Sequence, residues 1–339
     1  MTLPESAYLN FTADLRICRI LGGMWQVSGA HGSIRPQDAI RDMRLYHEAG
    51  FTTWDLADHY GPAEDFIGEF HRSMTTQHGI DYRTQIQALT KWVPRPGTVT
   101  LSEVKQAINT SLRRMGVPVL DLLQFHWWQY DDYSYMDALS MLADLRGTGL
   151  IRHLALTNFD TERLQLITER GIRIVSNQVQ YSLIDRRPEV MMTEYSKSNG
   201  IWLLPYGVLC GGFLSAKYLG QPDPKTYSLP TASLQKYKRM IDAWGGWGLF
   251  QSLLRVLSIV ADKHHVSISN IATRYILDKP MVAGVIIGVR LGLSEHRDET
   301  CKVFQIKLDE EDLGMIQAIQ TQSRDLFRVI GDCGSEYRN

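Results

Sequence analysis

The sequence predicts a single (β/α)8 barrel spanning residues 1–339. From about Arg19 onward, short apolar runs alternate with amphipathic segments, as is typical of βα units on a parallel sheet. Eight such apolar runs can be found, the number of strands that closes a barrel of this type. An open, doubly wound sheet is the competing fold. It is disfavoured because no GxGxxG opens a helix after the first strand and because polar residues end nearly every strand.

The eight predicted strands are short, and helices with recognisable start and stop signals lie between them. The strands are Ile20–Met24, Phe51–Asp55, Ile86–Thr90, Leu120–Phe125, His153–Leu156, Ile174–Gln178, Trp202–Pro205 and Val285–Gly288. The clearest helices are Pro36–Ala49, Leu101–Met115, Tyr135–Arg146, Thr161–Arg170 and Pro188–Asn199. Glycines such as Gly116 and Gly200 follow helix ends, where a left-handed residue is favoured.

Two segments fall outside this regular pattern. Residues 6–17 are expected to form a short β-hairpin under the barrel. Residues 207–249 form a long loop rich in Gly, Pro, Tyr and Trp after the seventh strand. Connections of that length are usually functional or disordered, and the aromatic residues favour an ordered lid over the site.

Composition excludes several classes of function. The chain is 44% hydrophobic and 22% charged, with a formal net charge of −1, which is ordinary for a globular protein. It has no basic run, so nucleic acid is not expected as a partner. No apolar run approaches the ~18 residues that span a bilayer, so no membrane is expected. The four cysteines lie far apart and form no CxxC, so we expect no metal and a reducing, cytoplasmic setting.

Polar residues follow the strands at the end where barrels of this type carry their active sites. Asp55 ends the second strand, Tyr60 lies five residues later, Lys91 follows the third strand and His126 the fourth. An ammonium near a phenol favours its ionised form, and a carboxylate can hold that ammonium in place. A histidine can orient a carbonyl and share its proton transfer. Taken alone, Asp55 and Lys91 fit a structural ion pair equally well, and His126 fits a partly buried histidine. The four together favour proton donation to an oxygen.

These residues lie in motifs that resemble the aldo-keto reductase superfamily. The motifs are Trp54-Asp55-Leu56-Ala57-Asp58-His59-Tyr60-Gly61, Thr90-Lys91-Trp92, Leu122-Leu123-Gln124-Phe125-His126-Trp127, Leu156-Thr157-Asn158-Phe159, Asn177-Gln178-Val179-Gln180-Tyr181, Tyr206-Gly207 with Gly211-Gly212-Phe213-Leu214, and Ile286-Ile287-Gly288-Val289-Arg290. The resemblance runs from about Leu15 to Leu313. It implies a carbonyl reductase that uses NADPH/NADP+, with Tyr60 as proton donor, Lys91 and Asp55 as its tuning pair and His126 orienting the substrate.

The resemblance also implies a cofactor site. Its residues would be Thr157, Asn158, Gln178, Tyr206, Gly207, Arg290 and Glu299. Asn158 and Gln178 would hold the nicotinamide carboxamide, Tyr206 would stack on the ring and Arg290 would bind the 2′-phosphate. The sequence departs from the family at Thr157, where Ser is usual, and at Glu299-Thr300, where Glu-Asn is usual. Trp25, Trp127 and Phe159 are expected to line the substrate pocket.

Two other functions remain open on the sequence alone. The chain fits an NADP-binding regulatory or scaffold subunit with slow turnover, since some members of the family serve in other assemblies. It also fits an alcohol or sugar dehydrogenase, because the same residues serve both directions of the reaction. The expected partners are a small carbonyl compound and no macromolecule, with the protein a monomer or weak dimer.

Overall fold

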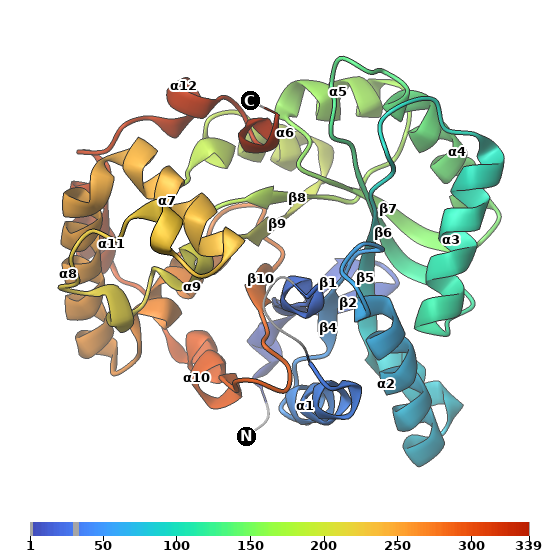
Figure 1. The fold of residues 1–339 in the computed structure, drawn as a ribbon, viewed down its shortest axis with the longest axis horizontal. Helices are drawn as coiled ribbons and strands as arrows, with labels where there is room; N and C mark the ends of the chain where they lie inside the picture. The colour runs from blue at the N-terminus through green and yellow to red at the C-terminus, as the bar shows by residue number, and fades with distance from the viewer. Residues whose placement is uncertain (1–2, 30–33, 339) are drawn as a thin grey trace.

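A computed structural model describes residues 3–29 and 34–338, and eight parallel strands form its centre (Figure 1). Their order around the sheet is β10-β3-β4-β5-β6-β7-β8-β9. They are β3 Ile20–Gly23, β4 Thr53–Asp55, β5 Gln87–Trp92, β6 Leu120–His126, β7 Ile151–Thr157, β8 Ser176–Gln180, β9 Trp202–Tyr206 and β10 Val285–Gly288. The other end strand, β9, joins the segment that leads into β10, where Leu203 N donates to Met281 O at 2.8 Å and Ala283 N to Leu203 O at 3.1 Å. The predicted barrel is therefore confirmed.

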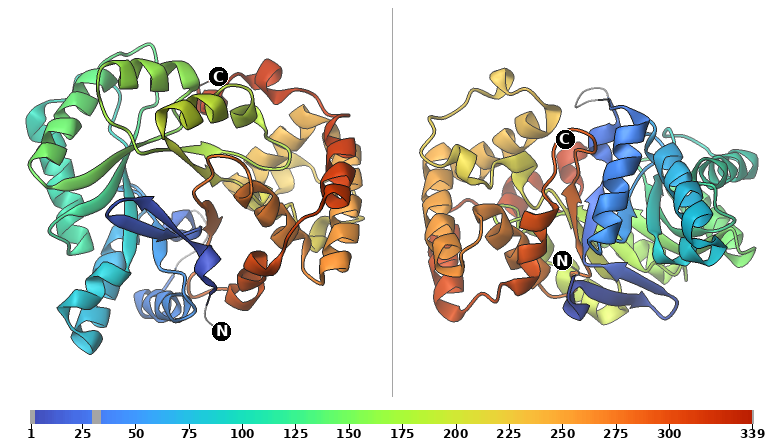
Figure 2. Two further views of the ribbon diagram at one scale, coloured as in Figure 1. Left: turned by 180° about the vertical axis from the view of Figure 1, so that it is seen from behind. Right: turned by 90° about the horizontal axis from the view of Figure 1, so that it is seen from below.

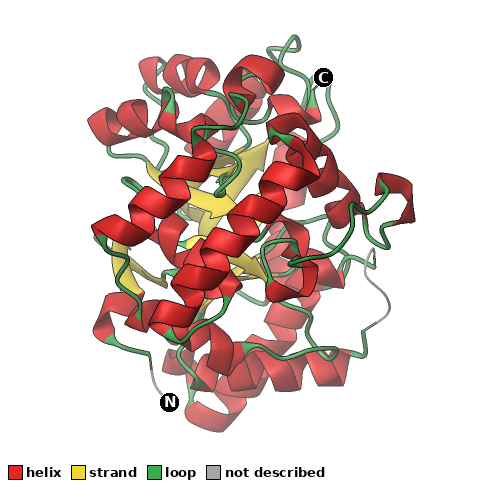
Figure 3. Ribbon diagram, turned by 90° about the vertical axis from the view of Figure 1, so that its left-hand side faces the viewer, coloured by secondary structure: helices red, strands yellow, loops and turns green. Residues whose placement is uncertain are grey.

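Helices surround the strands, which Figure 3 shows largely hidden behind them. The helices are α1 Pro36–Glu48, α2 Ala63–His78, α3 Leu101–Met115, α4 Tyr135–Gly147, α5 Thr161–Glu169, α6 Met192–Asn199, α7 Ala232–Trp244, α8 Gly246–His264, α9 Ile268–Leu277, α10 Arg297–Cys301, α11 Glu310–Gln320 and α12 Leu326–Ile330. The predicted bounds of α3 are correct because both ends carry strong signals. A capping box joins Thr100 to Glu103, and Gly116 is left-handed with φ 65°, as such ends require.

The predicted hairpin under the barrel is present as β1 Tyr8–Thr12 and β2 Leu15–Cys18. Figure 2 shows it, in dark blue, crossing the end of the barrel that faces away from the viewer in Figure 1. Phe11, Leu15 and Ile17 pack into one buried cluster with side chains from inside the barrel. The hairpin thus closes this end with apolar surface.

Residues 207–249 differ from the long loop that the sequence predicted. They contain all of α7 and the beginning of α8, together with short 3-10 turns. Leu234, Tyr237, Ile241 and Trp244 are buried along one face of α7, so the helical spacing was readable under the Gly- and Trp-rich composition. The aromatic residues also pack on one another: the ring centroids of Phe213 and Trp247 lie 5.8 Å apart.

The predicted helix Pro188–Asn199 is shorter in the structure. Arg187–Glu189 forms a 3-10 turn, and α6 begins only at Met192, after Met191 leaves the helical region at φ −136°. All four cysteines are buried free thiols. Within residues 3–29 and 34–338, no helix combines the length and apolar character that crossing a membrane requires.

Candidate active site

A buried ion pair lies at the carboxyl ends of β4 and β5. Lys91 Nζ donates to both carboxylate oxygens of Asp55, at 2.7 and 2.8 Å, and to Leu56 O at 2.8 Å. The side chains are only 2% and 4% exposed. Burial lowers the pKa of Lys91, and the Asp55 charge opposes that shift. The sequence predicted this pair, and adjacent parallel strands bring it together.

Two glutamines complete the surroundings of Asp55. Gln178 Nε2 and Gln124 Nε2 donate to Asp55 Oδ1 at 2.7 and 3.0 Å, and Gln178 Nε2 also reaches Gln124 Oε1 at 2.7 Å. Gln178 was predicted as a cofactor contact, and here its amide nitrogen faces the carboxylate. Gln124 was not predicted at all, although its alternation with His126 on one strand places both on the same face of β6.

Tyr60 lies above this pair. Lys91 Nζ is 5.1 Å from the centroid of the Tyr60 ring, and the ring of Trp25 packs edge-on against it with centroids 5.1 Å apart. Loss of solvent, and then the charge of Asp55, raise the pKa of Tyr60 well above its ordinary value. The sequence led us to expect a pKa lowered by Lys91. In the structure the loss of solvent and the Asp55 charge dominate, so the phenol keeps its proton at neutral pH.

His126 ends β6 on the same side of the barrel. Burial, followed by the nearby Arg338 charge, lowers the pKa of His126 to about 3, so its ring is neutral at working pH. Its Nε2 is buried and has no hydrogen-bond partner among the described residues. The Trp128 ring lies 4.4 Å away, centroid to centroid. An unpartnered buried ring nitrogen costs free energy unless a ligand reaches it.

A second group of predicted residues lies at the ends of β7 and β9. Asn158 N donates to Gln178 O at 2.8 Å, and the Tyr206 hydroxyl donates to Asn158 Oδ1 at 2.8 Å. Thr157 Oγ1 is buried without a hydrogen-bond partner within the described residues. Gly207 has φ 72°, and a Cβ there would lie 2.1 Å from the Tyr237 hydroxyl. We call the carboxyl end of the barrel, where these side chains gather, the mouth. This half of the mouth therefore carries the aromatic ring of Tyr206, the side-chain amide of Asn158 and the unpartnered hydroxyl of Thr157.

The two predicted residues at the far edge differ in their availability. The Arg290 side chain is exposed just beyond β10. Glu299 is engaged within the protein, because Asn270 Nδ2 donates to its carboxylate at 2.9 Å and Lys302 Nζ to the other oxygen at 2.8 Å. Within the described ranges the Arg290 side chain has no hydrogen-bond or ion-pair partner, whereas both carboxylate oxygens of Glu299 are engaged.

Two of the three predicted pocket residues lie elsewhere. Trp127 and Phe159 are both fully buried. Trp127 stacks on Phe125, and its indole nitrogen donates to Gln129 O at 2.7 Å. They belong to the core between barrel and helices, so the pocket-lining prediction is wrong for both. Trp25 does lie beside Tyr60, and Trp128, 38% exposed, takes the place expected of Trp127.

The segment Asp332–Arg338 reaches the site, which sequence reasoning missed. The Tyr206 hydroxyl lies 3.1 Å from the Tyr337 hydroxyl and 3.2 Å from Glu336 Oε1. The rings of Tyr337 and His126 have centroids 6.4 Å apart. The available signal was a glycine, Gly334, among charged and aromatic residues near the end of the sequence, but nothing in that pattern identifies its partner.

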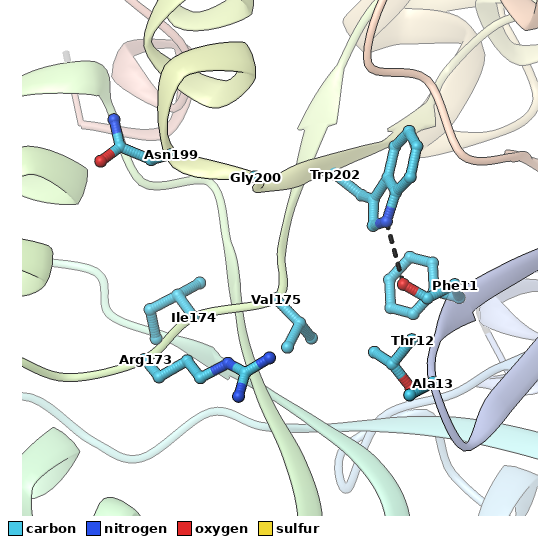
Figure 4. A pocket seen from close by; sticks show the side chains of 9 residues that line it. All are labelled: Phe11, Thr12, Ala13, Arg173, Ile174, Val175, Asn199, Gly200 and Trp202. Carbon is cyan, nitrogen blue, oxygen red and sulfur yellow. Dashed lines mark hydrogen bonds between the residues drawn. The ribbon is translucent and has the colours of Figure 1, made fainter.

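The cavity in Figure 4 lies at the opposite end of the barrel. Its lining residues, which come from the hairpin and from the segments that enter β8 and β9, are Phe11, Thr12, Ala13, Arg173, Ile174, Val175, Asn199, Gly200 and Trp202. Trp202 Nε1 donates to Phe11 O at 2.9 Å across it. Arg173 is the sole charged side chain in that lining, so the cavity shows no set of groups for catalysis.

Fold and site together define a (β/α)8 barrel whose carboxyl end carries a buried carboxylate–ammonium pair beside a tyrosine and a histidine. The sequence profile described as "Aldo/keto reductase family" matches residues 19–321. The chain belongs to the aldo/keto reductase family.

Individual relatives are distant. Aldo-keto reductase str7 of Strobilurus tenacellus is 23% identical over 87% of this chain and 85% of its own. Flagellar radial spoke protein 5 of Chlamydomonas reinhardtii is 32% identical, but the match covers 48% of this chain and 34% of that protein. An aldo-keto reductase from Klebsiella pneumoniae, solved in complex with NADPH, superposes with a TM-score of 0.70 at 20% identity, covering 94% of this chain and 96% of its own. At 20% identity this similarity supports the fold alone.

Proposed function

We propose that this protein reduces an aldehyde or ketone to an alcohol with NADPH. The observation that carries the proposal is the arrangement of four groups at one end of the barrel. The buried Asp55–Lys91 pair lies against the protonated Tyr60, and the neutral His126 presents an unpartnered nitrogen. A proton donor, a fixed positive charge and a hydrogen-bonding imidazole are what the protonation of a carbonyl oxygen requires.

The residues of the second half of the mouth fit the cofactor. Thr157 Oγ1 is a buried hydroxyl oxygen without a hydrogen-bond partner among the described residues. Asn158 and Tyr206 place an amide and an aromatic ring beside it. The exposed guanidinium of Arg290 suits a phosphate, since it can donate two parallel hydrogen bonds. NADPH, when bound there, supplies the hydride that reduces the carbonyl carbon. A family member solved with NADPH supports this choice.

The protein's own groups then act on the carbonyl oxygen. His126 and Tyr60 orient that oxygen by hydrogen bonds, and Tyr60 gives it a proton as negative charge develops there. The phenolate that remains is stabilised by the Lys91 ammonium, 5.1 Å from the ring centroid. Asp55 keeps the ammonium in place and is itself held by Gln124 and Gln178. A proton taken up from solvent then restores the Tyr60 hydroxyl.

A panel of aldehydes and ketones, assayed by loss of nicotinamide absorbance with NADPH and with NADH, tests the proposal. We expect turnover with at least one carbonyl class and a preference for NADPH. Lys91→Met tests the mechanism, because it removes the charge that stabilises the phenolate: we expect a large loss of kcat and a shifted pH–rate profile. A folded Lys91→Met protein with an unchanged pH profile would contradict the role of Lys91.

One observation favours a second candidate. The relative with 32% identity is named as a component of a flagellar radial spoke, which suits a scaffold or regulatory subunit. Tight binding of NADPH without turnover across the whole panel would favour that candidate. Turnover only when alcohols and NADP+ are supplied would favour a dehydrogenase instead.

A further inference from the structure

Asn158 adopts a strained backbone conformation at the centre of the proposed cofactor site. Its φ is 58°, a left-handed conformation that asparagine tolerates better than most residues but that still costs free energy. Such a residue persists when its surroundings hold it from several sides. Here the Asn158 carbonyl oxygen accepts from the Tyr130 hydroxyl at 2.7 Å and from Arg338 Nη1 at 2.9 Å.

Arg338 ties three chain segments to one another. Besides Asn158 O, its guanidinium donates to Gly334 O at 2.7 Å and to Trp127 O. The group also lies over the Tyr130 ring, 3.6 Å from its centroid. Gly334 allows this close approach, because a Cβ there would lie 2.1 Å from Asn158 O. The segment is therefore shaped to fit against Asn158.

Glu336 forms a second, independent connection to the site. Its Oε2 accepts from Arg187 Nη1 at 2.9 Å, in an ion pair with side chains 0% and 4% exposed. Arg187 is fixed in turn by two bonds from its guanidinium to Asp185, each 2.8 Å. The other oxygen of Glu336 meets the Tyr206 hydroxyl at 3.2 Å, and that hydroxyl donates to Asn158 Oδ1. A buried ionic chain thus ends on Tyr206 and Asn158, two of the three predicted nicotinamide contacts.

The family profile ends at residue 321, so Glu336 and Arg338 lie outside the region that it matches. We propose that Glu336 and Arg338 are positioning residues, which hold Tyr206 and Asn158 in the geometry that receives the nicotinamide half of the cofactor. This inference rests on the proposed function. Neither side chain needs to touch the cofactor, because each acts through a residue that does.

Charge and burial favour positioning over simple docking of the segment. A buried ion pair is costly to desolvate and is weak support for stability by itself, yet Arg187 and Glu336 are both buried. The neighbouring Arg187 holds the pKa of Glu336 below its usual value against the opposing effect of burial. Both polar anchors converge on Tyr206 and Asn158, which an apolar contact could not orient.

The test separates the two halves of the cofactor. The Kd of NADPH is measured by fluorescence, and the Kd of 2′,5′-ADP, which lacks nicotinamide, by its competition with NADPH. The variants are Arg338→Ala, Arg338→Lys and Glu336→Gln. The matched control is Arg328→Ala, which removes an exposed guanidinium that forms an ion pair with the exposed Asp325. In Glu336→Gln, Arg187 keeps its bonds to Asp185, so folding is expected to survive.

We expect Arg338→Ala and Glu336→Gln to weaken NADPH binding roughly tenfold, as for a lost charged hydrogen bond, and to lower kcat. The Kd of 2′,5′-ADP stays within about twofold of wild type, allowing for mutants far from a site. Arg338→Lys falls between wild type and Arg338→Ala, because lysine keeps the charge without the planar fork. Arg328→Ala matches wild type throughout.

Three results would overturn the inference. If NADPH and 2′,5′-ADP weaken equally, the segment supports the fold in general. If NADPH binds more tightly to the variants, the segment obstructs the site. If neither Kd nor kcat changes, the contacts have no role in the reaction. A wild-type protein that binds no NADPH contradicts the proposed function itself and the positioning role with it, so that failure is recognised before any variant is measured.

Discussion

The two ends of the barrel are built from opposite chemistry. At the end where the strands begin, the β1–β2 hairpin inserts Phe11, Leu15 and Ile17 into an apolar cluster. At the end where the strands finish, Asp55 and Lys91 are buried as charges. Apolar burial stabilises a fold at roughly 25 cal/mol per Å², whereas a buried ion pair barely recovers its desolvation cost. The hairpin end therefore contributes apolar stabilisation, and the opposite end carries the charged groups of the candidate site.

This difference predicts that substitutions at the two ends will separate stability from activity. At the hairpin end, a large change should lower the free energy of unfolding and leave the rate of the folded enzyme intact. At the opposite end, a change of one or two atoms should lower the rate and leave unfolding nearly unchanged.

Tyr60→Phe removes a single oxygen from the site. We expect kcat to fall by ~10²-fold or more, because the general acid is lost, while NADPH affinity and melting temperature stay near wild type. Steady-state kinetics and thermal melts measure both. Near-normal turnover by this variant would exclude Tyr60 as the proton donor.

Phe11→Ala makes the reverse test at the hairpin end. Phe11 is 3% exposed, and truncating a buried phenylalanine typically costs about 3–5 kcal/mol. Denaturant unfolding should reveal that loss, with kcat/KM of the folded protein unchanged. A comparable loss of kcat/KM would show that the two ends are coupled.

The sequence was informative about the two ends to different degrees. It predicted the hairpin and the positions of Asp55, Tyr60, Lys91 and His126, because strand ends and local motifs carry that information. It did not predict the direction in which the pKa of Tyr60 shifts, which depends on how much water remains around the phenol and how close the phenol lies to the Asp55 charge. Local spacing gives no measure of either quantity.

The errors concern contacts that the sequence pattern does not specify. Trp127 follows His126 directly, yet its indole turns into the core and finds Gln129 O, while Trp128 faces the site. The contacts of Arg338 with Asn158 join residues 180 positions apart, and no pattern in one sequence encodes such a pairing. Of the features that the sequence analysis missed, α7 alone could have been predicted, from the helical spacing of its buried residues.

Arg290→Ala tests the outer edge of the mouth, where charge is exposed and effects should be smaller. We expect NADPH to bind more weakly by roughly 1.5–3 kcal/mol, the range for hydrogen bonds to charged groups, with little change for NADH. Fluorescence titration with each cofactor measures the difference. Equal losses for both cofactors would mean that Arg290 does not contact the 2′-phosphate.

The smallest effect concerns buried histidines outside the site, which separate acid stability from catalysis. Burial lowers the pKa of His71 in α2 from 6.5 to about 4, and both of its ring nitrogens are buried without hydrogen-bond partners among the described residues. His71 binds a proton at higher pH in the unfolded chain than in the folded protein. The stability that neutral His71 contributes is therefore lost as the pH falls from 6.5 towards 4. At about pH 5.5 the linkage relation gives about 1 kcal/mol for this residue.

We therefore expect His71→Leu to lose less stability than wild type between neutral pH and about pH 5.5, by about 1 kcal/mol. Urea unfolding at the two pH values measures the difference. The pH–rate profile of the folded enzyme should not move, because His71 lies in the helical layer and His126 at the mouth. An unchanged acid sensitivity would show that His71 is protonated in the folded state, and a shifted rate profile would contradict the separation of the helical layer from the catalytic end.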